Sequence, residues 1–122
     1  MQINREEETA ANAITAYSAG EICIRDRVFH ASLILTRDTV IADWKAAPVD
    51  RLGIDDFERM FELAPEVVIL GTGSKQSMPP PELFAAFAAR GIGLEVMDTG
   101  AACRTYNLLL AEYRAVAVAL IV

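Results

Sequence analysis

The chain has 122 residues, of which 53% are hydrophobic and 23% are charged. This length suits one domain with its own hydrophobic core and is too short for two. The composition excludes a disordered chain, and no apolar run approaches the roughly 18 residues that a membrane-spanning helix needs. We therefore expect a single folded domain without membrane insertion.

The net charge of −6 argues against binding to nucleic acid, because affinity for the phosphate backbone comes from clustered Lys and Arg side chains. A protein or a small molecule is the expected partner. The first residues, with Arg5 before three glutamates, do not resemble a secretory signal, so we predict a cytoplasmic location. Cys23 and Cys103 are expected to be free thiols in that compartment.

The first half of the chain has the pattern of an antiparallel meander. Residues 1–16 are polar and weakly patterned, and we expect a flexible or edge segment there, ahead of a single α/β domain over residues 17–122. From Glu21 the sequence is rich in strand-forming residues up to Leu35, interrupted by a charged turn at 25–27. A second turn leads into a short third strand that ends near Trp44, a residue expected in the core or in an interface.

The second half alternates helices and strands in the order α-β-α-β-α-β. The first helix is predicted after Pro48, because Ile54, Phe57, Phe61 and Ala64 share one helical face. The later elements are predicted as a strand at 67–70, a helix at 82–90, a strand at 92–97, a helix at 99–113 and a strand at 115–122. Strands joined through helices are normally parallel, so we expect a small parallel sheet with the meander beside it or packed across one face.

Two clusters of small and polar residues follow the predicted strands at 67–70 and 92–97. If these strands are parallel neighbours, their ends meet at one sheet edge and form a crevice of the kind that binds ligands in open α/β sheets. The candidate ligand- or partner-binding residues are Gly71, Thr72, Gly73, Ser74, Asp98, Thr99, Cys103, Arg104 and Asn107.

Each candidate also has a structural interpretation. Asp98 or Thr99 suits the N-cap of the following helix. Cys103 is either a small buried residue or a thiol whose pKa is lowered by the helix N-terminus and Arg104. The Arg104 guanidinium is suited either to clamping an anion or to bonding loop carbonyls or Glu112, and Asn107 is equally ambiguous. The glycines that follow the first strand permit either a tight turn or the approach of an anion.

No cofactor, metal or catalytic signature accompanies these residues. The run from Gly73 to Gln76 lacks the Gly-Lys-Ser/Thr order of a phosphate-binding loop. Three prolines at 79–81 delay the next helix and remove the N–H donors that a dinucleotide site needs. His30 is the single histidine and is expected to be half-buried in a strand, without the motif of a Ser-His-Asp triad. We therefore expect no cofactor, no metal and no enzymatic activity.

The later motifs resemble one small family of largely unknown function. The resemblance rests on the strand end Gly71-Thr72-Gly73, the entry Met97-Asp98-Thr99, the run 101–107 and Glu112-x-Arg114. That family includes mitochondrial respiratory complex I assembly factor 3 and the adipogenesis-associated domain-containing protein. The resemblance implies a compact three-layer α/β domain with a mixed sheet. It also implies that Tyr113 stands where many relatives have Gly.

The resemblance favours an assembly or interaction factor that holds a protein partner, and it implies a respiratory-complex subunit as the candidate partner. The alternative is a module that binds a small anionic ligand through the loop at 71–74, Arg104 and the N-terminus of the third helix. A thiol-dependent enzyme with Cys103 as nucleophile ranks third, because no base is evident.

Overall fold

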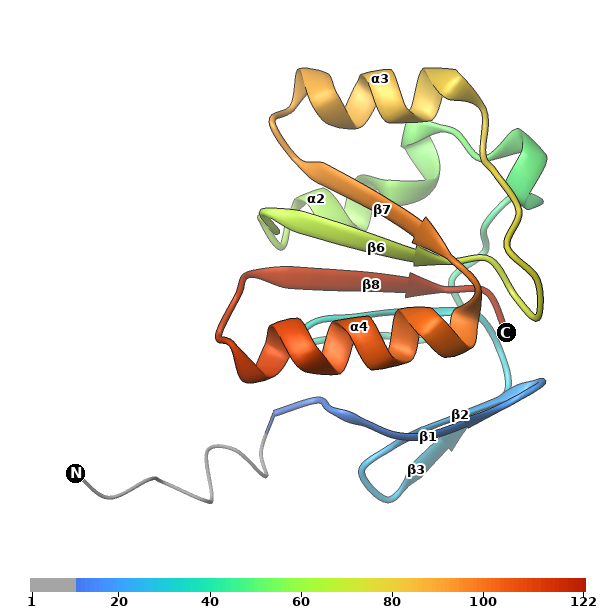
Figure 1. Cartoon of the computed structure of the whole chain (residues 1–122), viewed down its shortest axis with the longest axis vertical. Coiled ribbons are helices and arrows are strands. Elements are labelled where there is room, and N and C mark those ends of the chain that lie inside the picture. The colour runs from blue at the N-terminus through green and yellow to red at the C-terminus, as the bar shows by residue number, and fades with distance from the viewer. Residues whose placement is uncertain (1–10) are drawn as a thin grey trace.

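The structure is a computed structural model that describes residues 11–122 (Figure 1). Residues 1–10, the larger part of the predicted terminal segment 1–16, lie outside the described residues. The strands are β1 (Ile14–Ser18), β2 (Glu21–Ile24), β3 (Arg27–Phe29), β4 (Leu33–Leu35), β5 (Val40–Ile41), β6 (Val67–Gly71), β7 (Gly93–Met97) and β8 (Val116–Leu120). The helices are η1 (Val49–Arg51), η2 (Ile54–Phe57), α2 (Glu58–Phe61), α3 (Pro81–Ala89) and α4 (Thr99–Ala111).

The strands form two sheets. An antiparallel sheet has the order β1-β2-β3, and a mixed sheet has the order β5-β4-β8-β6-β7. In the mixed sheet β6 runs parallel to β7 and β8, whereas β4 is antiparallel to β5 and β8. The prediction of an α/β domain with a mixed sheet and an N-terminal antiparallel region is confirmed.

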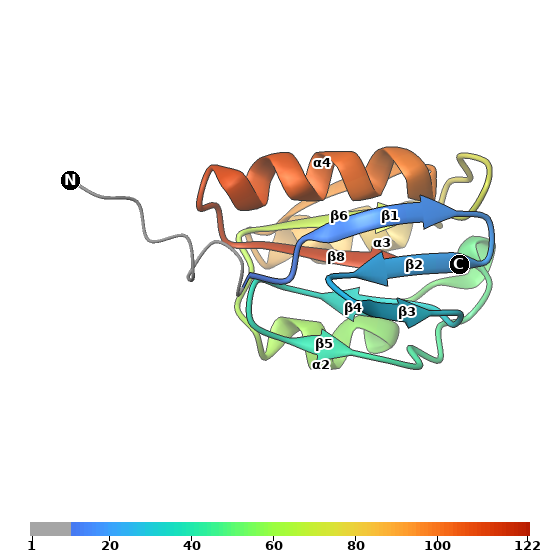
Figure 2. The same cartoon turned by 90° about the horizontal axis from the view of Figure 1, so that it is seen from below.

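The mixed sheet is the middle of three layers (Figures 1 and 2). One face packs against α4 and the three-stranded sheet, in a core that includes Ile22, Tyr106 and Val118. The other face packs against α2 and α3, in a core that includes Phe57 and Phe87. Because both faces are covered, every residue of β8 is buried, which explains why its sequence is apolar without alternation.

The predicted meander divides between the two sheets. The turn at 25–27 connects β2 to β3, as expected, but the chain then leaves this sheet and enters the mixed sheet as β4. All three residues of β4 are buried, since both faces of that strand are covered. The first strand begins at Ile14, which pairs with Ile24 on β2.

The helix predicted over 54–64 is largely replaced by a 3₁₀ turn and a single α-helical turn, so its predicted length is wrong. The Asp56 carboxylate accepts hydrogen bonds from the N–H groups of Gly53 (2.9 Å) and Ala47 (3.3 Å). The Trp44 indole donates to the Asp56 carbonyl at 2.7 Å. These tertiary bonds favour a tight turn at this point, and the left-handed Ala64 (φ 51°) ends the segment.

The other helices match their predictions within two residues. Asp98 is the N-cap of α4, and its carboxylate accepts from the Ala101 N–H at 2.9 Å. Gly91, just beyond α3, has φ 70°, which a glycine adopts without strain. Tyr113, just beyond α4, has φ 58°, a conformation that favours glycine and agrees with the residue expected in many relatives.

Gly71 at the end of β6 lies so close to α4 that a side chain does not fit. A Cβ atom there would lie 2.9 Å from Leu120 Cδ2 and 3.0 Å from both Ala102 Cβ and Thr99 Cα. We expect Gly71→Ala to lower the free energy of unfolding by about 1–3 kcal/mol, because the backbone of α4 must move away. Urea denaturation measures this loss.

Gly93→Ala on the neighbouring strand is the matched control. Its Cβ would meet only Val67 Cγ2, at an ordinary 3.7 Å, so neutral or slightly raised stability is expected. Equal destabilisation by the two substitutions would contradict the close contact at Gly71.

Candidate functional site

The two polar clusters meet at the C-terminal ends of β6 and β7, as predicted. Gly71 pairs with Met97 in the parallel register of β6 and β7, and the Thr72 N–H donates to the Met97 carbonyl at 2.9 Å. The Thr99 N–H donates to the Gly73 carbonyl at 2.8 Å. The strand ends and the first turn of α4 therefore form one connected unit.

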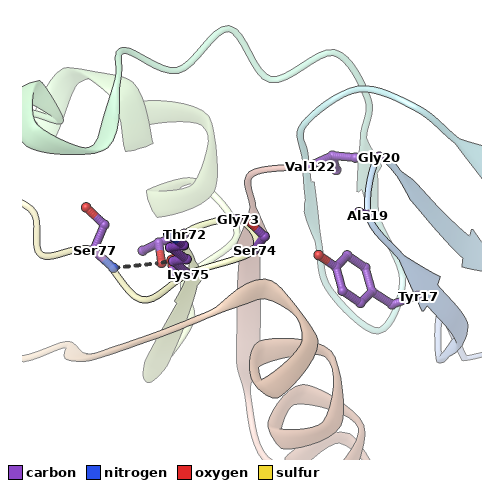
Figure 3. Close-up of a pocket in the computed structure, with 9 residues that line it drawn as sticks. All are labelled: Tyr17, Ala19, Gly20, Thr72, Gly73, Ser74, Lys75, Ser77 and Val122. Atoms are coloured by element: carbon purple, nitrogen blue, oxygen red, sulfur yellow. Dashed lines mark hydrogen bonds between the residues drawn. The ribbon is translucent and has the colours of Figure 1, made fainter.

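Two buried threonines in this unit use their hydroxyl groups internally. The Thr99 hydroxyl accepts from the Gly73 N–H at 2.8 Å and donates to the Ile121 carbonyl at 2.7 Å. The Thr72 hydroxyl donates to the Lys75 carbonyl at 2.7 Å and accepts from the Ser77 N–H at 3.1 Å, which shapes the loop after β6 (Figure 3). Neither hydroxyl is left to bind an external group.

Asn107 joins α4 to β1. Its side-chain carbonyl accepts from the Ile14 N–H at 2.9 Å, and its amide donates to the Ile14 carbonyl at 2.7 Å. The Tyr106 hydroxyl donates to the Asn12 carbonyl at 2.7 Å, so two neighbouring residues of α4 hold the same segment. The Asn107 side chain therefore bonds both backbone groups of Ile14, as the backbone of a neighbouring strand would.

A hollow of about 480 Å³ lies between the loop after β6 and the turn that connects β1 to β2 (Figure 3). We call it the strand-end hollow. Thr72, Gly73 and Ser74, three of the predicted residues, line it. The other lining residues are Tyr17, Ala19, Gly20, Lys75, Ser77 and Val122.

Cys103, Arg104 and Asn107 line a separate, smaller hollow between β1 and α4, of about 270 Å³. Tyr17 lines both hollows, and a Cβ on Gly100 would meet its ring at 3.5 Å. Six of the nine predicted residues therefore divide between two hollows, with Tyr17 contributing to each, whereas Gly71, Asp98 and Thr99 line neither. The sequence carried no signal for Tyr17, because its position depends on the packing of β1 across α4.

Arg104 is the predicted polar residue whose charge is available. Its side chain is exposed and makes no hydrogen bond or ion pair with any residue from 11 to 122, Glu112 included. It contributes a cation to the rim of the smaller hollow. A guanidinium in this position is suited to a carboxylate on another molecule.

The Cys103 thiol is buried, and burial raises its pKa to about 11 despite the nearby Arg104. A raised pKa keeps the thiol protonated near neutral pH, the reverse of what a nucleophile needs. Cys103 and Cys23 are both free, as predicted. His30 is exposed beyond the end of β3, so its prediction as a half-buried strand residue was wrong, and it lines neither hollow.

Within residues 11–122, no three His, Cys, Asp or Glu side chains are grouped so that they could hold a metal ion. Over the same range, none of the helices has the length and apolar character needed to cross a membrane.

The sequence from residue 14 to 121 matches the family described as "Protein of unknown function (DUF498/DUF598)". The chain is 34% identical to mouse NADH dehydrogenase (ubiquinone) 1 alpha subcomplex assembly factor 3, over 99% of this chain and 66% of that protein. It is 28% identical to the 13 kDa major membrane protein of Francisella tularensis, over 93% of this chain and 94% of that protein.

A crystal structure of a Bordetella parapertussis protein has the same fold. It is 38% identical to this chain and superposes with a TM-score of 0.82, over 92% of this chain and 96% of the other. The chain spans about two thirds of the length of the mouse relative, and nearly the whole of the two bacterial ones.

The two hydrogen bonds of Asn107 predict a structural effect. Asn107→Ala is expected to lower the free energy of unfolding by about 1–3 kcal/mol, because it leaves both backbone groups of Ile14 without their partner. Amide hydrogen exchange at Ile14 is expected to accelerate. The neighbouring Leu108→Ala is the control, since that side chain is 61% exposed, and an equal loss from both would contradict the role of Asn107.

The raised pKa of Cys103 predicts slow alkylation. Compared with a thiol of unshifted pKa 9.0, a pKa of about 11 leaves about one hundredfold less thiolate at pH 7. In a Cys23→Ser variant, iodoacetamide labelling followed by mass spectrometry is expected to be slow at neutral pH and still rising above pH 10. Fast labelling at mildly acidic pH, with the fold intact by circular dichroism, would contradict this assignment.

Proposed function

The chain belongs to the DUF498/DUF598 family of proteins of unknown function, and on that premise we propose that it is a non-enzymatic assembly or interaction factor. Its task is to hold a protein partner. The finer proposal is that this partner is a subunit of a respiratory complex.

The proposal rests on one observation: the polar groups at the strand ends form hydrogen bonds within the protein. Thr72, Thr99 and Asp98 all bond to nearby backbone groups, and Asn107 bonds to β1. In a ligand-binding or catalytic crevice such groups would point at the ligand. Here they stabilise the fold, which leaves the outer surface as the functional part of the molecule.

The mouse relative supports the same proposal, because its name describes an assembly factor. The match covers nearly all of this chain, so the domain described here corresponds to a large part of that protein. Since a third of the mouse protein lies outside the match, the identity of the partner is a proposal for this chain. The predicted cytoplasmic location likewise stays a prediction.

The two alternative hypotheses have weaker support. The anion-binding hypothesis combines the loop at 71–74 with Arg104 and the N-terminus of α4, but Arg104 lines a different hollow from that loop, and the Gly73 N–H is already bonded to the Thr99 hydroxyl. The thiol enzyme would need an activated Cys103, and the raised pKa of that thiol works against activation.

Quantitative affinity purification tests the proposal. The tagged chain is expressed in its own cells, the membranes are solubilised, and the recovery of respiratory-complex subunits is measured for the wild type and Arg104→Ala. We expect specific recovery by the wild type and a loss in the variant, because the Arg104 guanidinium is exposed and unpaired within residues 11–122. Loss of a charged contact at an interface typically weakens binding by about tenfold or more.

Arg90→Ala is the matched control, an exposed arginine at the end of α3 that lines neither hollow. Unchanged recovery with both substitutions would place the interface away from Arg104. Absence of any specific partner, under conditions that recover known complexes, would overturn the proposed function.

A further inference from the structure

A third hollow, of about 320 Å³, lies on the opposite side of the mixed sheet, between β5 and the η2–α2 segment. Ile41 and Trp44 give it an apolar floor, and Asp43, Asp55, Asp56 and Glu58 supply its carboxylates. We call it the Trp44 hollow. Figure 2 shows β5 at the free edge of the mixed sheet with α2 beside it.

The negative charge of the described residues is concentrated in the segment that builds this hollow. Residues 38–66 contain eight acidic and three basic side chains, a net charge of −5. The other residues from 11 to 122 contain six acidic and seven basic side chains, a net charge of +1. The hollow itself includes only Lys45 and Arg59 as cations against its four carboxylates.

The carboxylates in the hollow differ in what they already bind. Asp56 is engaged, because it accepts from the N–H groups of Gly53 and Ala47. Asp43, Asp55 and Glu58 make no side-chain hydrogen bond or ion pair with the described part of the chain. Their charges are therefore directed at solvent and available to a cation on another molecule.

Trp44 is held in a fixed position in this hollow. Its indole N–H donates to the Asp56 carbonyl at 2.7 Å, and its ring packs against Phe57 with the centroids 5.4 Å apart. The side chain is nevertheless only half-buried, so part of the ring faces the hollow. A rigid, partly exposed indole surrounded by carboxylates suits a guanidinium or ammonium group, through cation–π attraction and ion pairing together.

From this geometry we propose that the Trp44 hollow is the docking site for an Arg- or Lys-bearing segment of the protein partner, with one basic side chain lying over Trp44. The inference rests on the proposed function, which supplies a protein as the partner. Charge complementarity identifies the segment, because a basic chain is attracted to a hollow whose four carboxylates outnumber its two cations. The free edge of β5 leaves room for the backbone of that segment beside the hollow.

Trp44 is also the reporter for the test, since it is the single tryptophan of the chain. The probe is an acetylated and amidated eight-residue peptide in which Arg alternates with Val. The control peptide carries neutral citrulline in place of each Arg. We expect the Arg peptide to change the Trp44 fluorescence saturably and the citrulline peptide to leave it unchanged.

Two pairs of substitutions separate the hollow from the general charge of the molecule. Asp55→Asn with Glu58→Gln removes two charges from the hollow, and is expected to weaken binding by about tenfold. Glu82→Gln with Glu95→Gln removes two exposed charges elsewhere, and is expected to weaken it by less than about twofold. Equal weakening by both pairs, or a fluorescence that does not respond, would overturn the proposal.

Analytical ultracentrifugation of the chain alone tests whether a second copy of the chain occupies the Trp44 hollow. A dimer that dissociates in the Asp55→Asn, Glu58→Gln variant would make a second copy the occupant and would overturn the proposal. The purification experiment then separates the two proposals. Partner recovery that the same variant does not reduce would reject the hollow and leave the proposed function standing, whereas peptide binding at Trp44 without any recovered partner would reject the function alone.

Discussion

The first turn of α4 lies against the end of β6 with no space for a side chain between them. Gly71 provides this contact, and the Thr99 hydroxyl secures it by accepting from the Gly73 N–H and donating to the Ile121 carbonyl. Thr99 thus connects the loop after β6, the start of α4 and the chain just beyond β8. The position of α4 in turn places Asn107 and Tyr106 where they bond the segment that leads into β1.

These contacts give the polar residues at the strand ends a structural role. Parallel strands that end together usually present their following loops to a ligand. In this domain the side chains of Thr72, Asp98 and Thr99 bond to backbone groups at the strand ends, so these polar groups hold the fold together instead of facing a ligand. The exposed charged groups are then Arg104, on α4, and the carboxylates of the Trp44 hollow. Both are suited to charged contacts with another protein, in agreement with an interaction factor.

Prediction from the sequence was most accurate where interactions between residues close in the chain decide the structure. The N-cap at Asp98, the helix α3 and the strands β6 and β8 depend on neighbours in the chain, and the structure has them as expected. It was least accurate between 54 and 64, where the helical pattern is real but Trp44 and Asp56 form bonds that favour a tighter turn. Nor could a strand pattern show that β3 and β4 belong to different sheets, since both have the same local preference.

The sequence by itself determined the α/β class, the alternation of the second half, the meeting of two strand ends and the free state of both thiols. Only the tertiary structure decided that Tyr17 lies between two hollows, that Cys103 is buried with a raised pKa, and that the carboxylates around Trp44 face a common space. The physical reason is the distance along the chain over which each interaction acts. Caps, turns and periodicity act within a few residues, whereas burial and charge clustering depend on segments that are distant in the chain and meet only after folding.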